Sequence, residues 1–330
     1  RLAGLVCGVG LMSYPLPLTT VALIGRQESP EVADSIVALA GFFQSRGVRV
    51  LVETETAIEV SQLLGTAATA GAECGDFACI GTSVDLAVVV GGDGTLLHAA
   101  RQLARFNIPL VGINQGRLGF MTDIARSGML DAMALLMEGK FTPEDRLLLN
   151  TEVVFGGASA QWEPLANVAF NDVVIDKGAT GRMIEFELRV DDEFIYSARA
   201  DGLIICTPTG STAYALSANG PILHPKLGGI ALVPLCPHAL SNRPITLPDT
   251  ACIEVRLVQG ANARAHFDGQ ETVDLMPGDG VRLKKSPHRI KLLHPPSYSY
   301  FAMLRQKLHW SEGPSIRPGL VVNTPCGKQD

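Results

Sequence analysis

Continuous apolar runs alternate with helical patterns over the first 141 residues of the chain. The apolar runs are short and bounded by glycine, proline or polar residues, as in strands buried on both faces, and they lie at residues 21–24, 48–52, 84–90 and 109–113. Helical periodicity predicts helices over residues 31–46, 54–70, 95–103 and 127–139, and residues 71–83 are predicted to be a loop. This order of strands and helices predicts a parallel sheet.

After residue 141 the period of the pattern changes to two. Apolar and polar residues alternate in short strands, among them residues 147–155, 167–175, 185–190 and 194–200. We therefore predict an α/β N-terminal domain with a Rossmann-like parallel sheet, followed by a mostly antiparallel, all-β C-terminal domain. The fold is then α+β overall.

The change of pattern, together with a length of 330 residues, predicts two main domains. We expect the α/β domain at residues 20–143, the β domain at residues 144–295, and a segment at residues 296–310 that packs back on the N-terminal domain. Residues 1–19 are predicted to be an extension, disordered or artefactual, because Pro15 and Pro17 break an apolar stretch too short to span a membrane. Residues 311–330, punctuated by glycine and proline, are predicted to be a disordered tail.

Charge and cysteine usage narrow the functional classes. A net charge of −6 and an aromatic content of 6% argue against nucleic-acid binding, which requires a basic surface and stacking residues. The seven cysteines form no C-x-x-C pair and are expected to be reduced thiols of a cytoplasmic protein. We expect no membrane association.

A glycine-rich turn follows the third apolar run, in the sequence V-V-V-G-G-D-G-T-L-L of residues 88–97. Gly91, Gly92 and Gly94 place no side chain between the main chain and a bound phosphate, and amides at the start of the predicted helix face the same place. Asp93 is the only carboxylate in this turn. Because a carboxylate repels phosphate, Asp93 indicates a proton acceptor or a metal-holding group; the alternative is an Asp that caps the helix and closes the turn.

The loop after the fourth apolar run, residues 114–122, is predicted to line the same crevice. It contains Gly116 and Gly119 on either side of Arg117, followed by Phe120. Phe120 is a candidate wall for a nucleobase, and the alternative is that its ring packs into the core.

Two polar stretches interrupt the C-terminal strands. Asn171 and Asp172 lie inside an apolar strand and need partners if buried, which a ligand would supply, although such a pair is also typical of turns. Residues 207–212, T-P-T-G-S-T, offer hydroxyl and amide donors to a phosphate, and Tyr214 is placed to stack on a nucleobase. The alternative for this stretch is a helix cap rich in Ser and Thr.

Taken together, these motifs resemble those of the bacterial NAD kinase family. The resemblance rests on G-G-D-G-T (91–95), N-D (171–172), D-G (201–202), T-P-T-G-S-T-A-Y (207–214), L-V-P-L-C-P-H-A-L-S-N-R-P (232–244), F-D-G-Q (267–270) and Y-F-A-M-L-R-Q-K-L-H-W (300–310). It extends over residues 20–310. G-G-D-G-T alone is also similar to the signature of lipid kinases and phosphofructokinases, which do not share the other motifs.

The resemblance implies transfer of the γ-phosphoryl group of ATP to the 2′-hydroxyl of the adenosine ribose of NAD, which gives NADP. It implies that Asp93 is the general base and that a divalent metal, Mg²⁺ or Mn²⁺, accompanies ATP; it assigns no metal ligand in the chain. It also implies a homodimer or homotetramer, for which the strand edges of the β domain are the expected contact surface.

Further residues are implied to bind the dinucleotide. Asn171 and Asp172 would bind the adenosine half and Asp201 the nicotinamide end. The other implied contacts are Gly94, Arg182, Arg199, Thr212, Ala213, Tyr214, Ala215, Leu216, Ser217 and Gln270.

One departure and two alternatives bear on this assignment. The family's second motif is more often N-E than N-D, so the shorter Asp172 would hold a ribose differently. The alternatives are another G-G-D-G-T kinase acting on a lipid or a sugar, and a non-catalytic sensor of NAD or NADP. The T-P-T-G-S-T-A-Y stretch argues against the first, and the intact Asp93 argues against the second.

Overall fold

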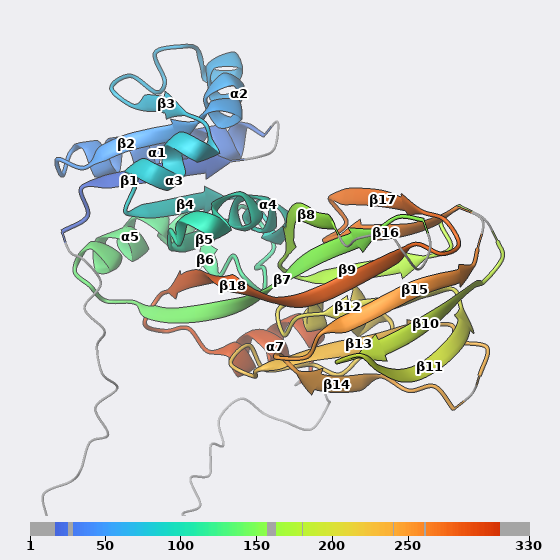
Figure 1. Cartoon of the computed structure of the whole chain (residues 1–330). Helices are drawn as coiled ribbons and strands as arrows, with labels where there is room; N and C mark the ends of the chain where they lie inside the picture. The colour runs from blue at the N-terminus through green and yellow to red at the C-terminus, as the bar shows by residue number, and fades with distance from the viewer. Residues whose placement is uncertain are drawn as a thin grey trace, which may run out of the picture. The chain divides into compact units, whose positions relative to one another are not determined.

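The N-terminal part of the computed structural model is a parallel sheet with helices on both faces (Figure 1). The structure describes residues 17–25, 29–156, 163–179, 181–239, 241–260 and 262–310. The parallel strands are, in spatial order, β5 (Leu110–Asn114), β4 (Leu86–Val90), β1 (Thr20–Gly25), β2 (Arg49–Glu53) and β3 (Glu73–Gly75). The helices are α1 (Pro30–Gln44), α2 (Thr54–Leu64), α3 (Phe77–Ser83), α4 (Asp93–Leu103) and α5 (Met129–Met137), the last preceded by the short strand β6 (Ile124–Ala125).

Successive side chains of each strand pack against different helices. On β4, Val88 packs in the core that includes α1 and α5, whereas Val89 packs in the core that includes α3 and α4. Both side chains are fully buried, which explains why the strand has no polar face. Because β2 lies on one side of β1 and β4 on the other, the carboxyl ends of β1 and β4 meet at a topological switch point, where open α/β sheets bind ligands.

The prediction of a loop over residues 71–83 is wrong. This segment forms β3, which pairs in parallel with β2, and α3, whose first turn is capped by Asp76 through a 2.8 Å hydrogen bond from the Cys79 N–H. The two elements are three and seven residues long, too short for a sequence period to show. The preceding helix is also shorter than predicted, because Gly65 ends it in a left-handed conformation with φ of 88°.

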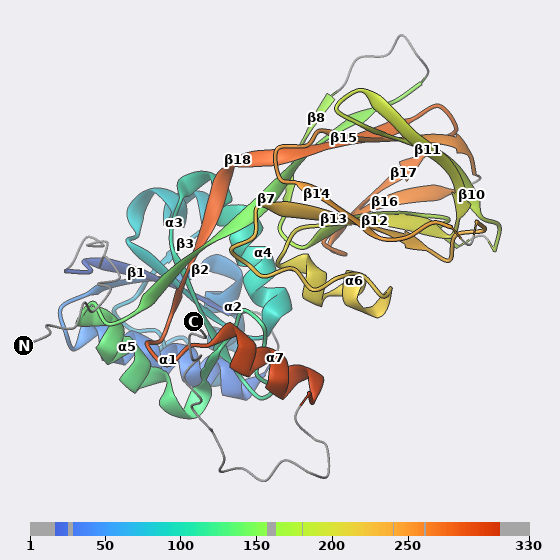
Figure 2. The same ribbon diagram turned by 90° about the horizontal axis from the view of Figure 1, so that it is seen from below.

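Two antiparallel sheets pack face to face in the C-terminal part (Figure 2). The first, of six strands, has the order β14 (Ile245–Pro248), β13 (Gly229–Leu235), β12 (Gly202–Cys206), β9 (Asp172–Asp176), β16 (Ala263–Phe267) and β17 (Glu271–Leu275). The second comprises β7 (Thr142–Val154), β8 (Glu163–Ala169), β10 (Ile184–Val190), β11 (Glu193–Ala200), β15 (Ile253–Gln259) and β18 (Gly280–His294). Alternation places Val173 and Ile175 in the core between the sheets, and Val174 on the outer face of the six-stranded sheet.

The strand β18 belongs to both parts of the chain. It pairs antiparallel with β7 and β15, and its residue Leu292 pairs in parallel with Leu110 of β5. The parallel strands and the second antiparallel sheet are therefore one continuous twelve-stranded sheet.

The predicted fold class is confirmed: an α/β N-terminal part with a parallel sheet precedes an antiparallel β part. The division at residues 143 and 144, and the packing of residues 296–310 on the N-terminal domain, stay predictions. Helix α7 (Tyr300–Leu308) belongs to a separate unit that begins at Ser297. The predicted tail at residues 311–330 and the predicted extension up to residue 16 lie outside the described residues. In the described part of the chain, no helix is long and apolar enough to cross a membrane.

Candidate active site

Asp93 begins helix α4, but its carboxylate binds a different segment. Its Oδ1 accepts hydrogen bonds from the Met121 N–H at 3.0 Å, the Thr122 N–H at 3.1 Å and the Thr122 hydroxyl at 3.1 Å. Its Oδ2 accepts one from the Phe120 N–H at 2.7 Å. The alternative that Asp93 caps the helix is wrong, because the N-cap position is Gly92 and no side chain caps this end.

The loop of residues 114–122 lies against Asp93 because Gly119 has no side chain. A Cβ atom at Gly119 would lie 2.0 Å from Asp93 Oδ1 and 2.2 Å from Thr122 Oγ1, so any larger residue must displace this contact. Asn114 fixes the other end of the loop, since its Nδ2 donates to the Thr122 carbonyl at 3.2 Å and to the Ile124 carbonyl at 3.1 Å. The structure thus brings together the two segments that were predicted to share one crevice.

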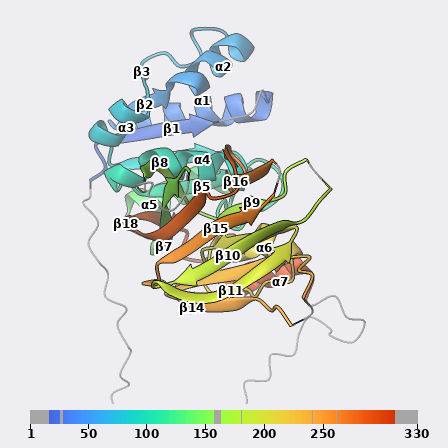
Figure 3. The ribbon, with the colours of Figure 1, turned by 45° about the vertical axis from the view of Figure 1, so that its right-hand side comes forward.

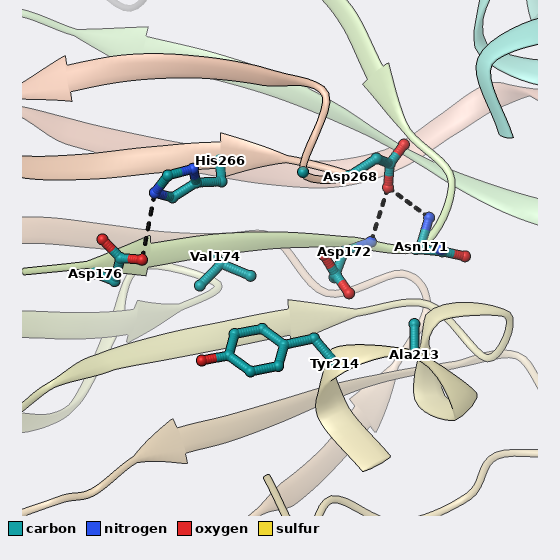
Figure 4. Close-up of a pocket in the computed structure, with 9 residues that line it drawn as sticks. Asn171, Asp172, Val174, Asp176, Ala213, Tyr214, His266 and Asp268 are labelled. Carbon is teal, nitrogen blue, oxygen red and sulfur yellow. Dashed lines mark hydrogen bonds and ion pairs between the residues drawn. The ribbon is translucent and has the colours of Figure 1, made fainter. Parts of the chain in front are cut away.

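A second carboxylate, that of Asp268, holds the segment between β8 and β9. It accepts a hydrogen bond from the N–H group of Phe170 at 2.8 Å. It also accepts hydrogen bonds from the N–H groups of Asn171 at 2.7 Å and Asp172 at 3.0 Å (Figure 4). These contacts satisfy the backbone where the apolar strand is interrupted, so Asn171 and Asp172 form a turn fixed by a distant carboxylate.

The two buried carboxyl groups of Asp172 and Asp268 influence each other. Burial and the nearby charge of Asp268 raise the pKa of Asp172 to about 7. Burial also raises the pKa of Asp268, against the opposing effect of three amide hydrogen bonds and of Arg101. Since only Asp268 has these compensating partners, we place the negative charge on Asp268, which favours the protonated form of Asp172.

The T-P-T-G-S-T loop packs on the same turn. The Thr207 hydroxyl donates to the Phe170 carbonyl at 2.6 Å, and a Cβ atom at Gly210 would lie 2.0 Å from the Asn171 carbonyl oxygen. The Ser211 hydroxyl is also buried and donates to the Pro208 carbonyl at 2.6 Å. The expectation that these hydroxyls serve as phosphate donors is therefore wrong for Thr207 and Ser211, which instead hold the loop itself.

A pocket of about 380 Å³ opens between this turn and helix α6 (Tyr214–Ser217), on the outer face of the six-stranded sheet (Figure 4). Its lining residues are Asn171, Asp172, Val174, Asp176, Ala213, Tyr214, His266, Asp268 and Gly269. The Tyr214 ring lies across from Val174 and is 49% exposed, so one aromatic face is available to a ligand.

Three lining residues with ionisable side chains, Asp176, His266 and Asp268, were not predicted as site residues from the sequence. Asp176 and His266 form one wall, with His266 Nε2 3.3 Å from Asp176 Oδ2. Asp176 is four residues after Asp172 on the same strand, so period-two alternation from Asp172 was the signal for it. His266 and Asp268 flank Phe267 of the F-D-G-Q motif, and His266 pairs with Val174 across the strands, a register that the sequence does not reveal.

Gln270 connects the pocket to the glycine-rich turn. It follows Gly269, which lines the pocket, and its Nε2 donates to the Gly94 carbonyl at 3.3 Å. One side chain thus links Gly94, the residue after Asp93, to the segment that lines the pocket.

The remaining predicted contacts do not line this pocket. Arg182 and Arg199 are exposed, and Asp201 pairs with Lys177, whose Nζ is 2.7 Å from Asp201 Oδ1. The others outside the lining are Thr212, Ala215, Leu216 and Ser217, of which Ala215 is fully buried between α6 and the six-stranded sheet.

Similarity to known proteins covers both parts of the chain. Residues 21–141 match the family model of the ATP-NAD kinase N-terminal domain, and residues 170–295 match that of the ATP-NAD kinase C-terminal domain. The NAD kinase of Aromatoleum aromaticum is 54% identical over 294 residues, which are 89% of this chain and 95% of the relative. The NAD kinase of Azoarcus sp. is 52% identical over 295 residues, 89% of this chain and 97% of the relative.

Two solved structures share the fold. The crystal structure of yeast NADH kinase complexed with NADH has a TM-score of 0.81 at 24% identity, over 92% of this chain and 91% of that one. The structure of an NAD kinase from Archaeoglobus fulgidus in complex with ATP has a TM-score of 0.66 at 24% identity. The match covers 88% of this chain and 99% of that one. With both domain models and these relatives matched over most of its length, the chain belongs to the ATP-NAD kinase family.

Proposed function

We propose that this protein transfers the γ-phosphoryl group of ATP to the 2′-hydroxyl of the adenosine ribose of NAD. The 2′-oxygen forms a bond to the γ-phosphorus, the bond from that phosphorus to the β–γ bridging oxygen breaks, and ADP leaves. The hydroxyl proton goes to Asp93. Membership of the ATP-NAD kinase family supports the reaction, and the geometry of Asp93 supports its part in it.

The single observation that carries the role of Asp93 is the uneven use of its two oxygens. Among the described residues, three donors approach Oδ1 but only the Phe120 N–H approaches Oδ2. A carboxylate oxygen accepts along two lone-pair directions, so Oδ2 retains one for a substrate hydroxyl. The donors on Oδ1 fix the orientation of the group, as a general base requires.

The pocket beside Tyr214 supports binding of the adenosine half of NAD. Its volume of about 380 Å³ falls in the range of roughly 300–1,000 Å³ found for small-molecule sites. Asn171 and Asp172 offer polar groups to a ribose, and Tyr214 offers a face to the base. Arg182, Arg199 and Asp201 lie outside this pocket, and we assign them to the remainder of the dinucleotide.

We propose that the divalent metal enters as part of the metal–ATP substrate. In the described ranges, no group of three or more His, Cys, Asp or Glu side chains is placed to hold a metal ion. Mg²⁺ or Mn²⁺ bound to ATP supplies charge neutralisation on the phosphates. The residues of this chain then align the hydroxyl and accept its proton.

We propose a homodimer or homotetramer, supported by the exposed apolar side chains Phe194 and Ile195 on β11, which is an edge strand of the twelve-stranded sheet (Figure 3). A cytoplasmic location is supported by the five described cysteines, which are free thiols.

The direct test incubates the purified protein with NAD, ATP and Mg²⁺ and detects NADP with an NADP-specific dehydrogenase. We expect NADP from the wild type only when ATP is present. Asp93→Asn should lower kcat by about 10²- to 10⁴-fold, the usual value of a general base, while calorimetry shows NAD binding retained. Asp131→Asn is the matched control, because Asp131 also lies in the first turn of a helix, α5, and should leave kcat unchanged.

Other results would change the assignment. Near-normal kcat in Asp93→Asn would exclude Asp93 as the base. NAD binding without any NADP from the wild type would exclude the kinase reaction with ATP and favour a dinucleotide sensor.

A further inference from the structure

Arg101 lies on α4, two helical turns after the glycine-rich motif, and its side chain is only 6% exposed. Its guanidinium binds the C-terminal part of the chain. Nε donates to the Val168 carbonyl at 2.9 Å, and Nη2 donates to Glu271 Oε1 at 2.9 Å. Nη1 donates to Gln270 Oε1 at 3.3 Å. A buried arginine with this many directed contacts fixes both the distance and the orientation between the elements that it joins.

Arg101 pairs with two carboxylates, of which Glu271 is partly exposed and Asp268 is buried. Arg101 Nε lies 3.5 Å from Asp268 Oδ2, and the Asp268 side chain has no exposed surface. Asp268 in turn binds the N–H groups of residues 170–172, the turn that lines the pocket. Arg101 therefore acts on this turn through a single intervening carboxylate.

Gln270 provides a second connection between Arg101 and the glycine-rich motif. Gln270 receives a hydrogen bond from Arg101 through Oε1 and donates through Nε2 to the Gly94 carbonyl. Residues 94 and 101 are seven positions apart and so lie on the same face of the helix. Helix α4 is thus attached to the F-D-G-Q turn at two points, Gly94 in its first turn and Arg101 near its end.

We infer that Arg101 is a positioning residue for the phosphoryl transfer: it sets the helix that carries Asp93 against the turn that carries Asn171 and Asp172. This inference rests on the proposed function. In-line transfer depends on alignment of the hydroxyl with its base, and a displacement of about 1 Å costs about 10²-fold in rate. Arg101 touches neither Asp93 nor the pocket lining other than Asp268, so its effect on NAD affinity is smaller than its effect on rate.

The test compares Arg101→Lys with Arg105→Lys. Lysine keeps the charge but loses the planar fork, so it cannot reach Val168, Gln270 and Glu271 together. Arg105 is the matched control, since it lies on the exposed surface one turn later and its guanidinium is over the Phe106 ring, 4.7 Å from the centroid. We expect Arg101→Lys to lower kcat by about 10²-fold, with a much smaller change in the calorimetric Kd for NAD. We expect Arg105→Lys to match the wild type.

Two further measurements keep the inference testable. Calorimetric stoichiometry gives the number of NAD-binding sites, so that kcat refers to folded protein alone. If Arg101→Lys does not fold, Glu271→Ala removes one of its partners at the surface and should lower kcat in the same direction by a smaller factor. Wild-type kcat in either variant, or an equal loss of NAD affinity and kcat, would overturn the inference.

Hydrogen exchange separates this inference from the proposed function. Arg101→Lys should speed amide exchange at residues 120–122 and 170–172, whose N–H groups are held by Asp93 and Asp268, whereas Arg105→Lys should not. This readout does not depend on NADP formation. If the wild type forms no NADP but amide exchange is faster in Arg101→Lys, the proposed reaction is wrong and the positioning of these two segments by Arg101 is supported. If amide exchange is unchanged in Arg101→Lys, Arg101 does not position them and the inference is wrong.

Discussion

At the scale of single residues, one arrangement occurs twice: a carboxylate that binds the amides of three successive residues from a distant loop. Asp93 does so with residues 120–122 and Asp268 with residues 170–172. The two differ in their surroundings, because Asp268 is fully buried beside Arg101 whereas Asp93 is partly exposed. A buried, paired carboxylate is suited to holding a loop, and a partly exposed one is also accessible to a substrate.

The pair of Asp172 and Asp268 predicts a pH dependence of stability. Burial and the charge of Asp268 raise the pKa of Asp172 to about 7 from 3.8, so between these values the folded state binds more protons than the unfolded state. The free energy of unfolding therefore falls as pH rises from about 4 to 7, by roughly 1.4 kcal/mol for each unit of pKa difference. Urea titrations of the wild type and Asp172→Asn at several pH values measure this. In Asp172→Asn, the free energy of unfolding should fall less steeply with pH over this range. The same pH dependence in the variant and the wild type would contradict the prediction.

At the scale of elements, the fit between α4 and the loop after β5 depends on one missing side chain. Gly119→Ala would place a Cβ atom 2.0 Å from Asp93 Oδ1. The loop or the carboxylate must then move by about 1 Å, and we expect kcat to fall by about 10²-fold. Gly116→Ala is the control within the same loop, since a Cβ atom there meets nothing within 4 Å. Steady-state kinetics of both variants measure this effect. Equal kcat values for the two variants would show that the close contact between Gly119 and Asp93 is not needed for the reaction.

The sequence predicted the elements whose residues interact locally. The apolar run of β4 and the glycine-rich turn are contiguous, so Asp93 could be singled out from its neighbours alone. The elements β3 and α3 could not be predicted, because their stability comes from pairing with β2 and from packing rather than from a repeated pattern.

The site residues that could not be predicted from the sequence are those whose role depends on contacts between distant segments. The roles of Asp268 and Arg101 come from their contacts with distant residues, which are as many as 170 positions away along the chain. A buried group of three residues also depends on contacts between distant segments: Asp123, Glu144 of β7 and His294 of β18. His294 Nδ1 lies 2.9 Å from Asp123 Oδ2, and His294 Nε2 lies 3.8 Å from Glu144 Oε1. Nothing local marks these residues as neighbours, since the register of β18 brings them together.

At the scale of the whole molecule, the edge strand β11 predicts self-association. Ile195 is 40% exposed on a strand whose outer side has no neighbour among the described strands. A lysine there would place a charge in any strand-to-strand contact, so Ile195→Lys should shift the protein toward the monomer. Sedimentation over a range of concentrations measures this. Ile58→Lys, at a side chain of α2 that is 52% exposed, is the control and should leave the assembly unchanged. A wild type that sediments as a monomer at all concentrations would contradict the prediction.

The shared strand β18 has a consequence for the order in which the protein is made. The ribosome delivers the parallel strands early, but Leu110 of β5 pairs with Leu292, which emerges near the end of synthesis. The N-terminal part therefore leaves the ribosome with Leu110 unpaired at this edge of β5, where β6 pairs only with Ile113 and Asn114, although the glycine-rich turn and its helix are already present. Its sheet is completed only when nearly all of the β-rich part has been translated, and helix α4 can make its contacts with residues 268–271 only after those residues have been translated as well.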